Sequence, residues 1–180
     1  MMRGNVDTRL AKLAAGEADA IFLANAGLNR LGFDVPRGLL DPVAAPPAPG
    51  QGALAVETRE GDADQPWVAA LRCLPTTIAV AAERGALFAL EGSCRTAIGA
   101  HAVIEGARLR LIVEALTPDG RQRFRHEGET AADLDSAQAL GVEIGRDTAA
   151  HMAWTFEELL AYAARGTWVR PGDVLGSGTC

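Results

Sequence analysis

The sequence predicts an α/β arrangement in its first part and a small α+β domain in its second part. Helical spacing, a short apolar run and a second helical segment follow one another over residues 8–32, as in a parallel α/β unit. From residue 98 onward, three runs with alternating polarity precede helical spacing, which favours an antiparallel sheet with helices on one face. A proline-rich segment at residues 42–52 separates the two parts.

The first part is predicted to be one helix–strand–helix unit. Apolar residues recur at helical spacing over residues 8–16, and Asn5 or Asp7 stands where it would cap the first turn. The apolar run at residues 18–24 predicts a buried strand, and residues 25–32 predict a tight turn into a short helix. Because one strand is too few for a sheet, we expect the chain to begin in the middle of a domain.

The proline-rich segment is predicted to be a crossover linker, since proline lacks a backbone donor and restricts the residue before it. Ala53–Glu57 after it reads as a strand that enters another sheet. A short helix over Asp64–Leu71 and a longer one over Thr76–Leu90 follow.

The last part is predicted to hold three antiparallel strands, two helices and a loose glycine-rich tail. A Thr-Pro-Asp-Gly sequence at residues 117–120 suits a hairpin turn between the second and third strands. We expect the arginines of these strands to face solvent. The predicted elements are Ile98–Glu105, Arg108–Leu116, Arg121–Glu127, Leu134–Thr148 and Thr155–Ala164, before the tail Gly166–Cys180.

Composition argues against several classes of protein. With 180 residues and 48% apolar residues, the chain is able to bury one good core or two small ones. A net charge of −6 without a Lys/Arg run argues against a nucleic-acid partner. Three widely spaced cysteines and three scattered histidines argue against disulfides and against a zinc site, so we expect no metal. The chain shows neither a membrane-spanning apolar run nor a signal-peptide pattern, so we expect a soluble, cytoplasmic protein without membrane partners.

Cys94 is the most informative residue, because it lies on a Gly/Ser turn between a helical pattern and a strand pattern. A thiol on a turn is positioned for chemistry, whereas a thiol within a helix usually fills space. For a cysteine without further context a buried structural thiol is the default interpretation, and we keep this interpretation for Cys73. Cys180 is a terminal thiol on the predicted tail.

Three motifs in this order resemble the porphobilinogen deaminase (hydroxymethylbilane synthase) family of tetrapyrrole biosynthesis. They are RGNVDTRL (3–10) with EADAIFLANAGLNRLG (17–32), then PAPGQGALAVE (47–57), then AAERGALFALEGSCRTAIG (81–99). The resemblance implies a transferase that condenses four porphobilinogen molecules head to tail, with loss of ammonia, to give hydroxymethylbilane. It also implies a dipyrromethane primer as cofactor, linked by a thioether to a cysteine that the motif places at Cys94.

The resemblance further implies that Arg3 and Arg9 bind the carboxylates of the pyrrole chain, with Asn5 and Gln51 as polar neighbours. Arginine suits this task because it is always charged and offers a planar fork of donors. Six residues correspond to roughly 240° around a helix, so both arginines reach one ligand only if Arg3 precedes the helix. Without the family, both would be read as solvated surface charges, and Gln51 as a residue that only holds the linker turn.

The family fold has two α/β domains like those of periplasmic binding proteins, joined by crossovers, and a small α+β domain with the cysteine. The amino-terminal part of this pattern is missing, along with the family's catalytic aspartate, so we identify no catalytic acid. The resemblance assigns residues 1–45 to the second half of α/β domain 2, 46–75 to the crossover and the returning strand and helix of domain 1, 76–166 to the cysteine domain and 167–180 to a flexible tail.

Two functions therefore stay open. The chain is either a fragment of a working deaminase, which binds porphobilinogen and the growing polypyrrole, or a non-catalytic remnant that acts as a binding or interaction module. An incomplete sheet would expose residues 21–23 and invite pairing with another chain, such as a separately encoded amino-terminal half. The full-length family is expected to be monomeric. A periplasmic-type binding protein ranks last, because it has no use for Cys94.

Overall fold

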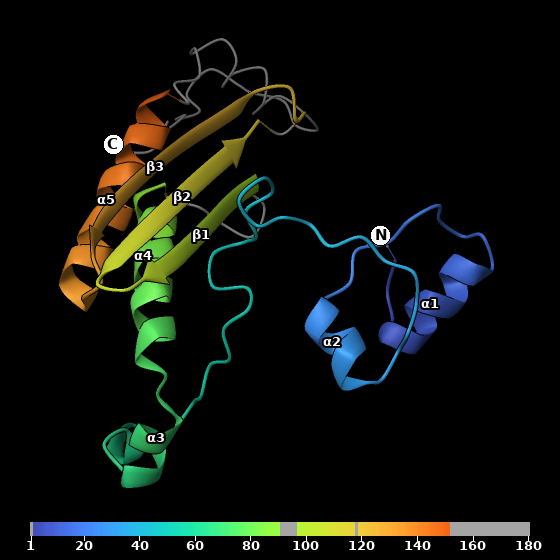
Figure 1. Cartoon of the computed structure of the whole chain (residues 1–180), viewed down its shortest axis with the longest axis horizontal. Helices are drawn as coiled ribbons and strands as arrows, with labels where there is room; N and C mark the ends of the chain where they lie inside the picture. Colours follow the sequence, from blue (N-terminus) through green and yellow to red (C-terminus); the bar gives the residue numbers. More distant parts are fainter. Residues whose placement is uncertain (1, 91–96, 118, 152–180) are drawn as a thin grey trace, which may run out of the picture. The chain divides into compact units, whose positions relative to one another are not determined.

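The computed structural model describes residues 2–90, 97–117 and 119–151 (Figure 1). Two compact units make up the chain, and they divide between Leu40 and Asp41. Cys94, with residues 91–96, lies outside the described residues. So do the predicted helix at residues 155–164 and the predicted tail.

The first unit contains two helices, α1 (Val6–Ala14) and α2 (Asn25–Arg30). Asn5 caps α1, because its Oδ1 accepts hydrogen bonds from the Thr8 backbone N (2.9 Å) and from Thr8 Oγ1 (2.7 Å). The helix therefore begins two residues earlier than its apolar spacing predicts. Both predicted helices of this unit are confirmed.

The two strands predicted at residues 18–24 and 53–57 do not form. Neither segment pairs with any other part of the described chain. Several of their side chains are open to solvent, with Phe22 83% and Leu54 88% exposed, whereas Ile21 and Leu23 are half-buried. A strand is held by its ladder partners and by burial of one face, and an apolar pattern without either remains irregular.

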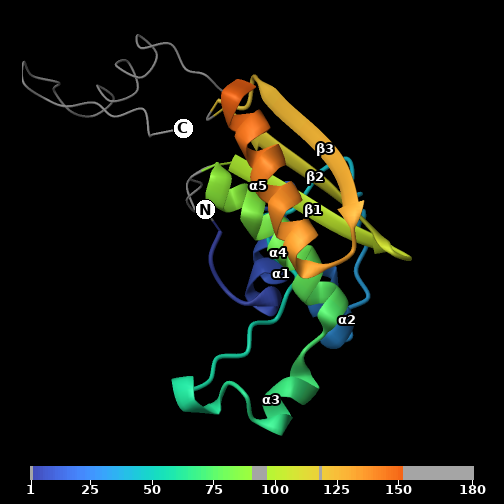
Figure 2. The same cartoon turned by 90° about the vertical axis from the view of Figure 1, so that its left-hand side faces the viewer.

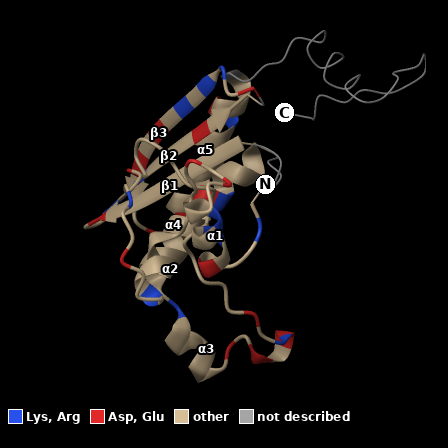
Figure 3. Ribbon diagram, turned by 90° about the vertical axis from the view of Figure 1, so that its right-hand side faces the viewer, with Lys and Arg blue, Asp and Glu red and all other residues tan. Residues whose placement is uncertain are grey.

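The second unit contains an antiparallel sheet with the strand order β1-β2-β3. Strand β1 (Ala97–Glu105) pairs with β2 (Arg108–Leu116) through a tight turn, and β2 pairs with β3 (Arg123–Ala131). The ladder to β3 starts later than predicted, because the Arg121 and Gln122 amides donate to Asp119 Oδ1 (3.1 Å) and Thr117 Oγ1 (3.0 Å) instead. Charged residues of both signs lie along β3 (Figure 3).

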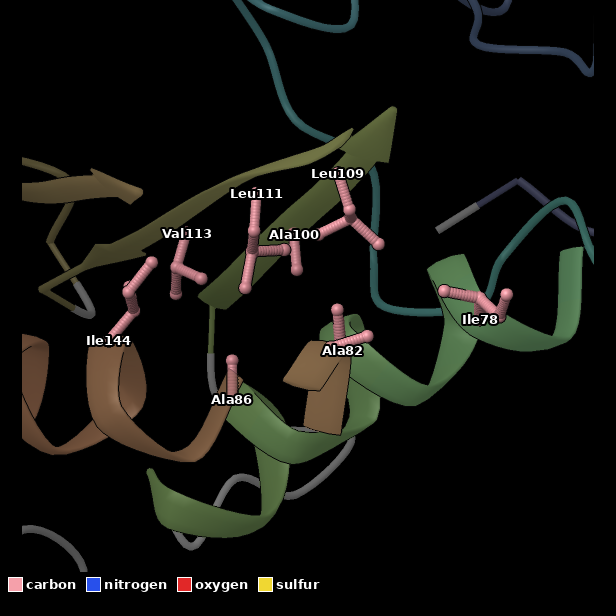
Figure 4. Packing of buried hydrophobic residues seen from close by; sticks show 9 residues of the cluster. Ile78, Ala82, Ala86, Ala100, Leu109, Leu111, Val113 and Ile144 are labelled. Atoms are coloured by element: carbon pink, nitrogen blue, oxygen red, sulfur yellow. The ribbon is translucent and has the colours of Figure 1, made fainter. Parts of the chain in front are cut away.

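Two long helices, α4 (Leu74–Ala89) and α5 (Leu134–His151), lie side by side on one face of the sheet (Figure 2). The core between them contains Ala82 and Ala86 of α4, Ile144 of α5, and Leu109, Leu111 and Val113 of β2 (Figure 4). This confirms the predicted three-stranded sheet with helices on one face. Shorter elements precede α4, namely the 3-10 helix η1 (Glu60–Asp62) and α3 (Pro66–Leu71).

Glycines bring α4 and α5 into backbone contact. A Cβ on Gly85 would lie 2.7 Å from Gln138 O, and one on Gly145 would lie 2.7 Å from Ala86 O. A Cβ on Gly141 would overlap the carbonyl oxygen of Ala82. The two helices therefore form one closely packed layer, which holds α4 in place beneath β1 and β2.

Candidate functional site

The two predicted arginines lie at the start of α1, one in the loop before the helix and one on the helix itself. Arg3 lies before the N-cap Asn5, outside the helix, as the expectation for a shared ligand requires. Half-buried Arg9 reaches back from α1, and its Nε donates to Gly4 O at 3.0 Å. Gly4 adopts φ +129°, which L side chains rarely adopt, and this turn presents its carbonyl to Arg9.

Arg9 keeps donors available for a ligand. Only its Nε is used in this contact, and its two terminal nitrogens make no hydrogen bond with the described residues. The exposed side chain of Arg3 likewise makes none with them. Guanidinium groups whose terminal nitrogens make no other hydrogen bond are suited to bind carboxylates, since each offers a fork of charged donors.

Lys12 joins this cluster, and sequence reasoning missed it. Its Nζ donates to Arg3 O at 3.3 Å, so a third cation lies against the same loop. Arg9 and Lys12 are three residues apart, which places them on neighbouring positions of one helix face. That spacing from Arg9 was the signal available in the sequence.

Asn5 and Gln51 both have structural tasks. The Oδ1 atom of Asn5 caps α1. Exposed Gln51 closes the linker turn, because its Oε1 accepts from the Ala48 N at 3.2 Å. The second geometry agrees with the alternative interpretation of Gln51 as a residue that holds this turn, and it leaves the amide NH2 as a donor.

The proline-rich segment belongs to the second unit and is docked on its sheet. Pro47 O accepts from Ala100 N (2.8 Å) on β1, and Ala44 O accepts from Arg123 Nη2 (3.1 Å) on β3. A Cβ on Gly99 would overlap the carbonyl of Pro46, so the contact is close. Arg123 is exposed, as expected of the strand arginines, and it also binds both this segment and Glu114. Arg125 departs from that expectation, because it is half-buried and lies 3.5 Å from Glu114 Oε2.

Glu83 is a second residue that sequence reasoning missed. It lies on α4 with 8% of its surface exposed. Its Oε2 accepts from Gly50 N at 2.7 Å, and its Oε1 accepts from Ala102 N at 2.9 Å. The signal in the sequence was a carboxylate among the apolar residues of a helix, where a buried charged group needs partners.

The interpretation of Cys73 as a buried structural thiol is wrong, because this cysteine is free and exposed. It is the N-cap residue of α4, and Thr76 Oγ1 donates to its Sγ at 3.1 Å. The hydrogen bond from the Thr76 side chain lowers the pKa of the Cys73 thiol, and the Thr76 backbone adds to this effect. The thiol lies at the N-cap and not on the apolar face of the helix, and there it is open to solvent.

Two further pairs of opposite charges join β2 and β3. Arg110 Nη2 lies 2.7 Å from Glu127 Oε2, and Arg108 Nε lies 3.2 Å from Glu129 Oε2. The Arg110 guanidinium lowers the pKa of the Glu127 carboxyl through its hydrogen bond and charge. Residues 2–90, 97–117 and 119–151 contain no group of three His, Cys, Asp or Glu that could hold a metal ion. Over the same residues, no helix combines the length and apolarity needed to cross a membrane.

Two family models match this chain. Residues 1–66 match "Porphobilinogen deaminase, dipyromethane cofactor binding domain", and residues 77–150 match "Porphobilinogen deaminase, C-terminal domain". The porphobilinogen deaminase of Caulobacter sp. (strain K31) is 67% identical over 150 residues, which are 81% of this chain and 47% of that protein. The enzyme of that name from Phenylobacterium zucineum is 65% identical over 151 residues, again 81% of this chain and 47% of the relative. The chain thus spans about half the length of the curated relatives it matches.

Proposed function

Because this chain belongs to the porphobilinogen deaminase family, we propose that it acts in tetrapyrrole biosynthesis as a hydroxymethylbilane synthase. The proposed reaction joins four porphobilinogen molecules head to tail, with loss of one ammonia at each addition. The observation that carries the proposal is identity of 64–67% over 150–155 residues to several deaminases. The two matched regions include Arg3, Arg9, Asn5, Gln51 and Cys94.

The basic loop at α1 supports a polycarboxylate ligand. Each pyrrole unit carries an acetate and a propionate, so a growing chain gathers negative charge. Arg3, Arg9 and Lys12 place three cations at one loop, and Arg9 keeps its terminal nitrogens for a ligand. This donor set fits dipyrromethane, and we propose that these residues hold and orient its carboxylates.

Cys94 is the proposed attachment point. Loss of ammonia from porphobilinogen leaves an electrophilic methylene carbon, and the thiolate of Cys94 attacks that carbon to form a stable C–S bond. When bound, the primer supplies the pyrrole terminus to which each new unit is added. We assign no catalytic acid within this chain.

The finer architecture belongs to the same proposal. Residues 1–45 and 46–75 would contribute to α/β domains like those of periplasmic binding proteins. Residues 76–166 would form the cysteine domain, and 167–180 its tail. The proposed enzyme is cytoplasmic and, as the family resemblance implies, monomeric at full length; the alternative is that this chain pairs with a separately encoded amino-terminal half.

One observation favours a second function. Exposed apolar side chains such as Phe22 and Leu54 are available to another polypeptide. A non-catalytic remnant that acts as an interaction module would use such segments.

The intact mass of the protein tests the proposal. The wild type and the Cys94→Ser variant are each incubated with porphobilinogen or hydroxymethylbilane, alone and with the amino-terminal portion of the Caulobacter sp. deaminase. We expect a two-pyrrole adduct on the wild type only, and turnover of porphobilinogen in the combined sample. An adduct on both variants would exclude Cys94 as the attachment point. No adduct on either, in the combined sample, would favour the interaction module.

A further inference from the structure

We propose that Glu83 is a positioning residue. It fixes the turn that bears Gln51 to one helix and one strand, which precede and follow the Cys94 segment in the sequence. The helix is α4, which ends at Ala89, and the strand is β1, which begins at Ala97. What Gln51 binds rests on the function proposed above, whereas the anchoring itself rests only on described contacts.

The anchoring depends on one buried carboxylate that joins three segments. Glu83 Oε2 accepts from Gly50 N (2.7 Å) in the linker, and Oε1 accepts from Ala102 N (2.9 Å) in β1. Each oxygen thus satisfies one backbone donor. A carboxylate is an acceptor only, and its bonds to N–H groups are stronger than those between neutral groups. A side chain with one acceptor is unable to replace it.

Both donors need this partner because secondary structure does not supply one. Strand β1 lies at the edge of the sheet, and the Ala102 amide donates to Glu83 at that edge. Gly50 lies in a turn at φ +70°, outside any helix or strand. Both hydrogen bonds are partly buried, and an N–H that leaves water without gaining an acceptor is costly, so Glu83 links the stability of the turn to that of the edge.

The linker before the turn is already held. Ala44 O and Pro47 O accept from Arg123 and Ala100, and the prolines between these residues restrict the backbone. Glu83 holds Gly50, directly beside Gln51, and so sets where the Gln51 side chain emerges. Gln51 Oε1 is bound to Ala48 N, which leaves its amide NH2 to donate to a substrate carboxylate.

Hydrogen exchange of the whole chain tests the anchoring without any activity. Glu83→Gln preserves volume but offers one acceptor oxygen and places an NH2 group against the other amide. We expect exchange in the peptides around Gly50 and Ala102 to accelerate about tenfold, as expected for loss of one charge-assisted hydrogen bond. The matched control Glu143→Gln removes an exposed carboxylate from α5 and should leave exchange unchanged. Wild-type exchange at both peptides in Glu83→Gln would overturn the proposal.

Kinetics separate positioning from a merely structural role. In the chain combined with the amino-terminal portion of a relative, Glu83→Gln should raise the KM for porphobilinogen about tenfold and leave kcat within about twofold. Gln51→Ala should do the same, and the double variant should resemble either single variant because the two residues act through one contact. A smaller folded fraction would instead lower kcat at constant KM. That result, or effects that multiply in the double variant, would overturn the proposal.

A second variant covers the case in which Glu83→Gln does not fold. Gly50→Ala strains the turn at φ +70°, and its Cβ meets only Val80 Cγ1, at 3.8 Å. We expect faster exchange around Gly50, unchanged exchange around Ala102, and the same rise in KM. An unchanged KM would exclude the positioning role. If the wild-type combined sample does not consume porphobilinogen, the proposed function fails, and the exchange result still decides whether Glu83 anchors the turn.

Discussion

The backbone of the loop before α1 orients the side chain of Arg9. The positive φ of Gly4 presents a carbonyl to Arg9 Nε, so the guanidinium is oriented while its terminal nitrogens stay available. Histidine at this position would lack the fork of donors and would be mostly neutral at pH 7–8. We expect Arg9→His to lower kcat/KM for porphobilinogen by about 10- to 100-fold, the loss of one charged hydrogen-bonded pair. Steady-state kinetics of the chain combined with the amino-terminal portion of a relative measure this change.

The control for Arg9 is Arg30→His, which changes an exposed arginine on α2. Its kinetics should match the wild type. Equal kinetics for Arg9→His and the wild type would show that Arg9 is only a surface charge.

Cys73 provides a prediction about pH. Its pKa is lowered by the hydrogen bond from Thr76, so the thiolate fraction near pH 7–8 is larger than for an ordinary exposed thiol. Thr76→Val removes the hydroxyl donor and should move the pKa of Cys73 upward. We expect the pH profile of its alkylation by iodoacetamide, followed by peptide mapping, to shift to higher pH. Thr77→Val is the control, because Thr77 Oγ1 donates to the Cys73 carbonyl and not to its sulfur. An unshifted profile for Thr76→Val would contradict this account.

At the scale of elements, the contact between α4 and α5 leaves no room for a side chain at Gly141. A Cβ there would overlap the Ala82 carbonyl, which belongs to a helix backbone and is unable to yield alone. We expect Gly141→Ala to lower the free energy of unfolding by about 1–3 kcal/mol, as for other overpacked cores. Urea unfolding followed by circular dichroism measures this.

Gly61→Ala serves as its control, because a Cβ there would meet no atom within 4 Å. Its stability should stay close to that of the wild type. Should both substitutions have the same small effect, the two helices must be able to separate at low cost.

Prediction from the sequence succeeded for strands whose pairing partners are their neighbours in the chain. Strand β2 forms over the predicted residues, because hairpin neighbours in the same chain complete its ladder. The run at residues 18–24 has the same apolar character but no partner among the described residues, and local pattern does not reveal this. Similarly, the resemblance pointed to Arg3 and Arg9, but not to Glu83, whose role depends on contacts with Gly50 and Ala102 far along the chain.

At the scale of the whole molecule, the unpaired apolar segments predict self-association of this chain. Phe22 and Leu54 are largely exposed on backbone without ladder partners, and such segments pair readily with other chains. We expect the 180-residue chain to show concentration-dependent mass in size-exclusion chromatography with light scattering. The double variant Phe22→Ser/Leu54→Ser should be largely monomeric.

Phe88→Ser distinguishes association through unpaired backbone from nonspecific association of exposed apolar side chains. Phe88 is nearly as exposed as Phe22, at 81% against 83%, but lies on α4, where its backbone N–H donates within the helix. If unpaired strand-like segments drive association, this variant keeps the concentration dependence of the wild type. Addition of the amino-terminal portion of a relative should suppress it, because the α/β domains proposed above would pair these segments with strands from that portion. A wild-type chain that stays monomeric at all concentrations would show that these segments need no partner.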